Sequence, residues 1–79
     1  MIHNFKINSI YFEPVINKKK TFEIRKNDRN FRLGDYICLN EWNPEENAYT
    51  GRSVKGQIIY ITNYEQKDNY VVFGFKLTE

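Results

Sequence analysis

Hydrophobic positions in the first third of the chain predict a strand followed by a helix. Ile2–Ile7 alternates in the way that is typical of a half-buried strand. Ser9 is placed to cap a helix over Ile10–Lys18, since a serine hydroxyl accepts hydrogen bonds from the first helical turn. Pro14 suits only a first turn, so the regular helix is expected to begin late. Four hydrophobic side chains of this helix are expected to face the core: Tyr11, Phe12, Val15 and Ile16.

The next alternation, Thr21–Lys26, predicts a short strand whose two faces differ. Phe22 and Ile24 fall on one face and are expected to anchor the strand. The other face carries three polar side chains in succession: Thr21, Glu23 and Arg25. A solvent-facing strand normally carries scattered charges, so this succession is a candidate functional feature.

The remaining chain predicts three more strands, separated by turns. Turn-forming residues occur at Asn27–Asn30 and Leu33–Asp35, and Asn43–Gly51 is the longest stretch that is expected to be irregular. The predicted strands are Tyr36–Glu41, Ser53–Asn63 and Tyr70–Leu77. Together these elements predict one α+β domain over residues 1–79: a small, mixed, mostly antiparallel five-stranded β-barrel capped by one N-terminal helix.

Composition agrees with a small folded domain and excludes several kinds of site. The chain has 79 residues, of which 41% are hydrophobic and 16% aromatic. Its single cysteine, Cys38, excludes an internal disulfide and a cysteine-based zinc site, and is expected to be a buried hydrophobe. His3 alone gives no metal motif, so neither a metal nor a cofactor is expected. The absence of a long apolar run predicts a cytoplasmic protein that does not enter a membrane.

Positive charge is concentrated in one segment, Lys18–Arg32. This segment holds seven of the twelve basic residues and is opposed only by Glu23 and Asp28. Its net charge is therefore +5, while the rest of the chain is net −3. Such polarity favours an anionic partner, although a merely solvated charged face would give the same pattern.

Glu23 and Arg25 lie on one face of the predicted strand, close enough to form an ion pair. If the helix packs over that face, the pair lines a cleft together with Lys20, and the cations can grip a phosphate or a base edge. If the face is open to solvent, the pair is an ordinary ion pair worth about 0–1 kcal/mol. Spacing alone leaves both interpretations open.

The run Lys20–Arg25 resembles the G-x-K-T-x-x-x-R signature of ASCH domains, which belong to the PUA-like superfamily. Leu33–Asp35 is similar to the G-D pair that begins the next strand of such domains. Tyr49–Arg52 and Gln66–Asp68 resemble a subgroup of short proteins that are frequent in phages and bacterial prophages. Lys18 stands where many members have glycine, and Asn17 is expected to supply the left-handed backbone there instead.

This resemblance implies a PUA-like barrel whose cleft, between the helix and the Lys20–Lys26 strand, binds RNA or a nucleotide. The candidate binding residues are Lys19, Lys20, Thr21, Glu23, Arg25, Lys26, Arg29, Tyr49 and Arg52. Tyr49 is expected to stack on bases; Trp42 could do so too, or could cap the end of the barrel.

Two alternatives stay open. Some ASCH proteins resemble small amidohydrolases that act on a modified nucleoside, and this chain keeps their lysine as Lys20. Glu23, however, occupies the position of their nucleophilic threonine, and a later carboxylate has only Glu65 and Asp68 as candidates. The second alternative is a phage or prophage protein-interaction module with an exposed aromatic patch. Its candidate residues are Tyr60, Tyr64 and Tyr70, which barrel packing would explain more simply.

Overall fold

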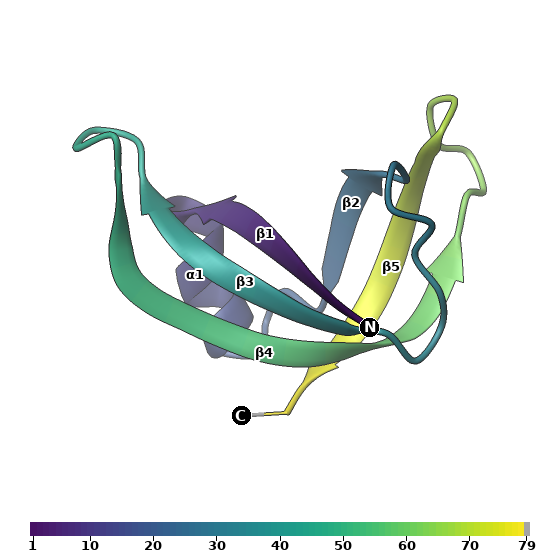
Figure 1. Ribbon diagram of the computed structural model, residues 1–79, viewed down its shortest axis with the longest axis horizontal. Helices are drawn as coiled ribbons and strands as arrows, with labels where there is room; N and C mark the ends of the chain where they lie inside the picture. Colours follow the sequence, from purple (N-terminus) through teal and green to yellow (C-terminus); the bar gives the residue numbers. More distant parts are fainter. Residues whose placement is uncertain (79) are drawn as a thin grey trace.

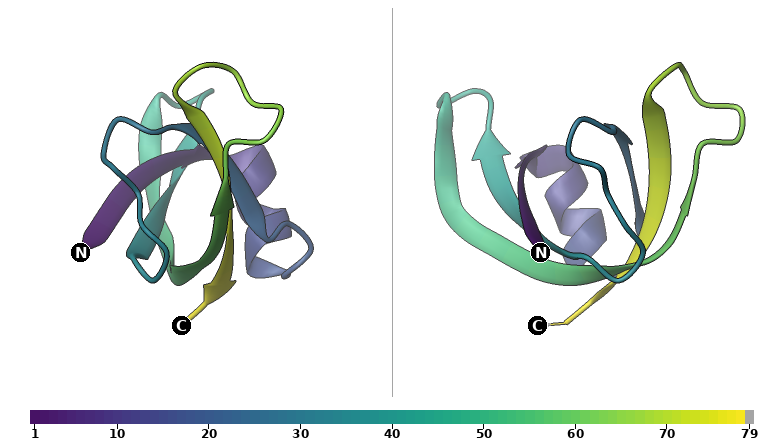
Figure 2. Two further views of the ribbon diagram at one scale, coloured as in Figure 1. Left: turned by 90° about the vertical axis from the view of Figure 1, so that its right-hand side faces the viewer. Right: turned by 45° about the vertical axis from the view of Figure 1, so that its right-hand side comes forward.

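The computed structural model describes residues 1–78 as one curled β-sheet with a short helix on its concave side (Figures 1 and 2). The elements, in chain order, are β1 (Ile2–Asn8), α1 (Ser9–Ile16), β2 (Phe22–Lys26), β3 (Tyr36–Asn43), β4 (Ala48–Thr62) and β5 (Tyr70–Leu77). The strand order is β1-β3-β4-β5-β2, with β1 and β3 parallel and the other pairs antiparallel. The expected α+β class and the mixed, mostly antiparallel five-stranded sheet are confirmed, in the form of a half-barrel.

The long strand β4 gives the sheet its curvature. Its first half pairs with β3 and its second half with β5, so the chain bends along it (Figure 1). A register shift between Ile58 and Tyr60 and another between Asn40 and Trp42 mark irregularities, which increase local twist and bending. The curl brings the two edge strands, β1 and β2, to opposite sides of one opening.

The core fills the concave side of the sheet, beneath α1. The largest fully buried side chains come from the helix and from three strands: Phe12, Phe73, Ile37, Leu39, Ile58 and Val15. Rings of Phe5, Phe31 and Phe73 lie 5.5–6.0 Å apart, centroid to centroid, and extend the core toward the opening. Cys38 is buried, as expected.

The helix differs from its prediction at both ends. Its N-cap is Asn8 and not Ser9, because the Asn8 side chain accepts a hydrogen bond from the Ile10 N–H at 3.0 Å. The helix ends at Ile16, and Lys18, not Asn17, takes the left-handed conformation, with φ of 62°. Tyr11 is not a core residue: half of its surface is exposed, since the helix turns that side toward the opening.

The prediction for β2 was wrong about which of its faces points to the core. Phe22 and Ile24 are 44% and 54% exposed on the convex face, whereas Glu23 is only 4% exposed. The inward position suits Glu23 because Lys20 and Arg25 donate to its carboxylate there. The stretch 43–51 is likewise not irregular: β3 and β4 continue through it as a hairpin, with Trp42 paired to Tyr49.

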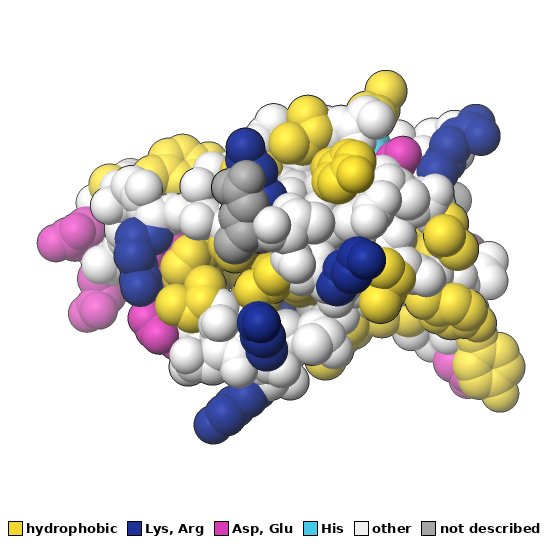
Figure 3. Space-filling model, turned by 90° about the horizontal axis from the view of Figure 1, so that it is seen from below, with side chains coloured by type: hydrophobic (Ala, Val, Ile, Leu, Met, Phe, Trp, Pro, Cys, Tyr) yellow, Lys and Arg dark blue, Asp and Glu magenta, His cyan; other side chains and the backbone are white. Residues whose placement is uncertain are grey.

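Several hydrophobic side chains lie on the convex surface of the sheet. Figure 3, which views the molecule from below, shows Lys and Arg side chains scattered among hydrophobic ones, with acidic side chains toward the ends. Of the three tyrosines that were candidates either for an exposed aromatic patch or for barrel packing, Tyr60 and Tyr64 are exposed and Tyr70 is half-buried.

Candidate functional site

Glu23 is the centre of an ion cluster at the opening of the half-barrel. Its Oε1 accepts from Nε of Arg25 at 2.9 Å and lies 2.8 Å from Nη2 of the same guanidinium. Its Oε2 accepts from Nζ of Lys20, which also donates to the backbone carbonyl of Phe22 at 2.8 Å. A nearly buried carboxylate therefore holds two cations in fixed positions.

The cluster borders a cleft of about 520 Å³ between the β1–α1 junction and β2. Lys6 and Tyr11 contribute from one side, and Phe22 with the ion cluster from the other. The charged groups of Lys20, Arg25 and Glu23 lie at the cleft, whereas the amine of Lys6 lies 4.4 Å from the ring centroid of Trp42. Two cations and one carboxylate leave the cleft with excess positive charge. Its volume lies within the range of roughly 300–1,000 Å³ that is common for small-ligand sites.

Two exposed aromatic rings stand beside the amine of Lys20. Nζ lies 5.0 Å from the ring centroid of Phe22 and 5.7 Å from that of Tyr11. Tyr11 comes from α1 and Phe22 from β2, so the rings belong to opposite walls of the cleft. Exposed rings next to a fixed cation can stack a planar group while the cation binds an attached anion.

Two arginines from the β2 side reach across the opening to β1. Nη2 of Arg25 donates to the Lys6 carbonyl at 3.2 Å, and Nη1 of Arg29 donates to the Asn4 carbonyl at 2.6 Å. Their guanidinium carbons lie 4.6 and 4.7 Å from the ring centroid of Phe5. Within the part of the chain that the structure describes, no acceptor pairs with Nη1 of Arg25, which stays available to a ligand.

The structure brings only some of the predicted site residues to this cleft. Lys20, Glu23 and Arg25 line it, and Arg29 lies nearby at β1. The side chains of Thr21, Lys19 and Lys26 are exposed around it without lining it. Sequence reasoning missed the contributions of Lys6 and Tyr11, which are remote in sequence from β2, and of Phe22, which was expected in the core.

Arg52 and Tyr49 lie in a different place, at the hairpin end of β4. Arg52 donates to Glu41 through Nε at 2.8 Å and through Nη2 at 3.0 Å, and also to Glu13 at 2.8 Å. Thr50 donates to the same Glu41 at 2.6 Å. Tyr49 packs edge-on against Trp42, with ring centroids 5.0 Å apart. One cation thus faces two carboxylates, so this cluster has no excess positive charge.

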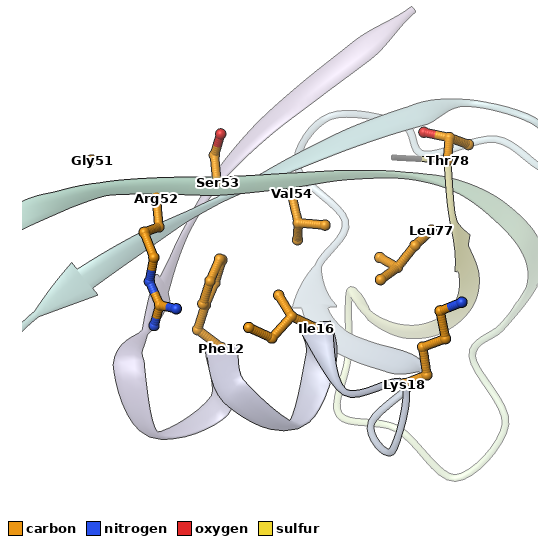
Figure 4. Close-up of a pocket in the computed structure, with 9 residues that line it drawn as sticks. All are labelled: Phe12, Ile16, Lys18, Gly51, Arg52, Ser53, Val54, Leu77 and Thr78. Atoms are coloured by element: carbon orange, nitrogen blue, oxygen red, sulfur yellow. The ribbon is translucent and has the colours of Figure 1, made fainter.

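Arg52 also lines a second cavity of about 780 Å³ between α1 and β4 (Figure 4). Its guanidinium carbon lies 4.9 Å from the ring centroid of Phe12, and the apolar side chains of Ile16, Val54 and Leu77 point into the same space (Figure 4). Lys18 stands at its margin. Polar and apolar groups contribute similarly to the lining of this cavity. It differs from the cleft at Glu23 because its arginine is already paired with two carboxylates.

Two carboxyl groups have pKa values that hydrogen bonds lower. The pKa of Glu41 lies below its ordinary value of 4.5, chiefly because Arg52 and then Thr50 donate to it. The pKa of Asp35 lies below 3.8, chiefly because it accepts from Nε2 of His3 at 2.8 Å, with a further contribution from the Arg32 N–H. The pKa of Arg52 is raised by the same contact with Glu41.

His3, the residue that could have suggested a metal, is therefore a partner of Asp35. Over residues 1–78, no group of three or more His, Cys, Asp or Glu side chains is arranged to hold a metal ion. The same residues include no helix that is long and apolar enough to cross a membrane.

Comparison with known proteins identifies the family of this chain and a relative from a phage. The model of a family described as a domain of unknown function (DUF3850) matches residues 2–75. An uncharacterized 12.9 kDa protein in the GpA 3′ region of Escherichia phage P2 is 40% identical over 62 residues. That alignment covers 78% of this chain and 55% of the phage protein, so the chain spans about half the length of this relative. The relative's phage origin agrees with the phage association expected from the sequence.

Proposed function

Because this chain belongs to the family of domains of unknown function DUF3850, whose description assigns no activity, we propose its function from the geometry of the cleft. The chain binds single-stranded RNA, and the cleft between the β1–α1 junction and β2 receives one nucleotide. Its relationship to ASCH domains of the PUA-like superfamily is part of the same proposal. In support, the run that resembles their signature overlaps β2, and its Lys20 and Arg25 line the cleft.

The observation that carries the proposal is the arrangement of Lys20, Glu23 and Arg25. An exposed ion pair would be mobile and largely screened by salt, whereas here the carboxylate is only 4% exposed and fixes both cations. Preorganised cations bind a phosphate without first being ordered, which strengthens binding. The Nη1 group of Arg25 and the ammonium of Lys20 are suited to contact phosphate oxygens.

The rings of Tyr11 and Phe22 supply the second part of a nucleotide site. Both are about half exposed and both flank the amine of Lys20. Stacking of a base on an aromatic side chain contributes about 1–3 kcal/mol in single-stranded complexes and tolerates any base. The expected ligand is therefore single-stranded RNA, because its unpaired bases are free to stack. The protein would meet this ligand in the cytoplasm.

The geometry favours binding over amide hydrolysis. Both carboxylate oxygens of Glu23 already accept from cations, so the group is poorly placed to take a proton from water. Glu65 and Asp68, the candidates for a later carboxylate, do not line the cleft. An assay for deacetylation of acetylated cytidine is therefore expected to show no turnover; turnover that Lys20→Ala abolishes would favour the hydrolase alternative.

Fluorescence anisotropy with a labelled RNA decanucleotide of mixed sequence tests the proposal. Tyr11→Ala should weaken binding about tenfold through lost stacking. Lys20→Gln should weaken it and reduce the salt dependence by about 0.7 log unit per log unit of salt, the value for one phosphate contact. Lys67→Gln, in the β4–β5 turn and outside the cleft, is the matched charge control. Absent binding at low salt, or equal effects of the Lys20 and Lys67 variants, would refute the proposal.

A further inference from the structure

On the convex face, Gly74 lies between two exposed aromatic residues. The register of the sheet places it directly opposite Phe22 on β2 and directly opposite Tyr60 on β4. Directly opposed residues of neighbouring strands point to the same face. Phe22 is 44% and Tyr60 is 64% exposed, so a position without a side chain lies between two solvent-exposed aromatic residues.

The fold itself does not require glycine at position 74. The left-handed backbone explains Gly34 and Gly51, whose φ angles are 95° and 94°. Close packing explains Gly56, where a Cβ would lie 2.9 Å from the Lys76 carbonyl oxygen. At Gly74 a Cβ would meet only the Thr21 carbonyl oxygen, at an ordinary contact distance of 3.7 Å, and φ is not in the left-handed region.

Glycine weakens the interior of a strand, and one that the fold does not need often marks the approach of a ligand. The register leaves position 74 without a side chain between Phe22 and Tyr60, and this space, with Gly74 as its floor, is called the slot. The two flanking strands are separated by two strand spacings, about 9.6 Å. A planar group that enters this space can stack on either ring.

The charge of the convex face favours an anionic occupant. Glu23 is the only acidic residue of β2, β4 and β5, all of which the structure describes, and it is buried on the opposite face. The convex face of the same strands carries Lys26, paired to Tyr70, and Lys76, two residues from Gly74. Lys and Arg side chains are interspersed with hydrophobic ones over the surface in Figure 3.

We propose that the slot formed by Phe22, Gly74 and Tyr60 receives a base of single-stranded RNA. Phe22 lines both the slot and the cleft, so a strand that leaves the cleft passes over the edge of β2 onto the convex face. Lys26 and Lys76 flank this path and contact the phosphates. The inference rests on the proposed function and extends it from one bound nucleotide to at least two.

Gly74→Val tests the slot because it fills the space while suiting the strand. A β-branched side chain favours β-structure, so the variant should fold with unchanged or higher stability, which urea unfolding verifies. We expect its affinity for the RNA decanucleotide to fall about tenfold, as for loss of one stacked base. Its affinity for cytidine monophosphate, which needs only the cleft, should equal that of the wild type.

Two tyrosine variants complete the test. Tyr60→Ala should reproduce the loss of decanucleotide affinity, whereas Tyr64→Ala, exposed in the β4–β5 turn, should have no effect. A stable Gly74→Val variant that binds the decanucleotide like the wild type would overturn the slot and leave the proposed function intact. Wild-type protein that binds neither ligand would overturn both. Sedimentation showing that the wild type dimerises and Gly74→Val does not would instead assign this face to self-association.

Discussion

Nη1 of Arg29 donates to the carbonyl oxygen of Asn4 at 2.6 Å, and this hydrogen bond joins the segment that follows β2 to the edge strand β1. Edge strands expose backbone groups that invite pairing with another chain. In this protein, the guanidinium groups of Arg25 and Arg29 satisfy two carbonyls of β1 and stack against Phe5. The arginines therefore stabilise the opening and also give it positive charge.

Arg29→Ala should destabilise the fold by about 1–2 kcal/mol. The expected loss combines one hydrogen bond to a backbone carbonyl with one cation–π contact. Urea unfolding monitored by circular dichroism measures it. Arg32→Ala removes the same charge from an exposed side chain and should change the free energy of unfolding by less than about 0.5 kcal/mol. Equal effects of the two substitutions would show that Arg29 contributes charge alone.

Lys18→Gly should stabilise the protein by about 0.5–1 kcal/mol. Lys18 has φ of 62°, a left-handed conformation that costs roughly 1–2 kcal/mol for a residue with a Cβ and little for glycine. The greater freedom of glycine in the unfolded chain cancels part of this gain. Lys19→Gly, at a neighbour without a left-handed backbone, should be neutral or destabilising, and stabilisation by both changes would contradict the explanation.

Stability should fall in acid through Asp35 and Glu41. Both carboxyl groups have pKa values lowered in the folded state, by His3 and by Arg52 respectively. A carboxyl group whose pKa is lower in the folded state stabilises the fold fully at pH values above its unfolded-state pKa. This stabilisation is lost as the pH falls through its folded-state pKa. The free energy of unfolding is therefore expected to be steady above about pH 5 and to decline toward pH 3.

Glu41→Gln tests this pH dependence. The variant should be less stable than the wild type at pH 7, because the charge-assisted bonds to Arg52 and Thr50 weaken. The difference should narrow as the pH falls through the lowered pKa of Glu41, because the wild-type carboxyl then becomes protonated. Glu45→Gln, in the exposed turn of the hairpin, should follow the wild-type curve. A constant difference between Glu41→Gln and wild type at all pH values would contradict the assignment.

The sequence predicted the elements well because hydrophobic alternation and turn residues are local signals. It could not determine which face of β2 points inward, since alternation defines two faces without ranking them. Phe22 and Ile24 suggested the core side, yet the edge of an open sheet buries Glu23 because Lys20 and Arg25 satisfy it. Which face of β2 is buried therefore depends on tertiary contacts.

The hairpin at the end of β3 was missed for a different reason. Pro44, Asn47 and Gly51 suggested a long loop, but only the turn itself needs such residues. Asn47 takes a left-handed backbone in that turn, with φ of 53°, and Gly51 has a positive φ within β4 without ending it.

For the candidate site, the local cluster of Lys20, Glu23 and Arg25 could be predicted from its spacing. The opposite wall, with Lys6 and Tyr11, comes from a segment that only the fold brings alongside. Arg52 was grouped with the basic residues by charge, whereas its partners Glu13 and Glu41 are far from it in sequence and determine its role.

Chemical-shift mapping of ¹⁵N-labelled protein titrated with a short RNA tests whether the cleft binds RNA, because it locates the ligand without a substitution. We expect progressive shifts at the amides that surround the cleft, those of Lys6–Asn8, Tyr11 and Lys20–Arg25, with the indole of Trp42 and the amides around Arg52 unaffected. No shifts at low salt, or shifts centred on the cavity beside Arg52, would contradict this expectation.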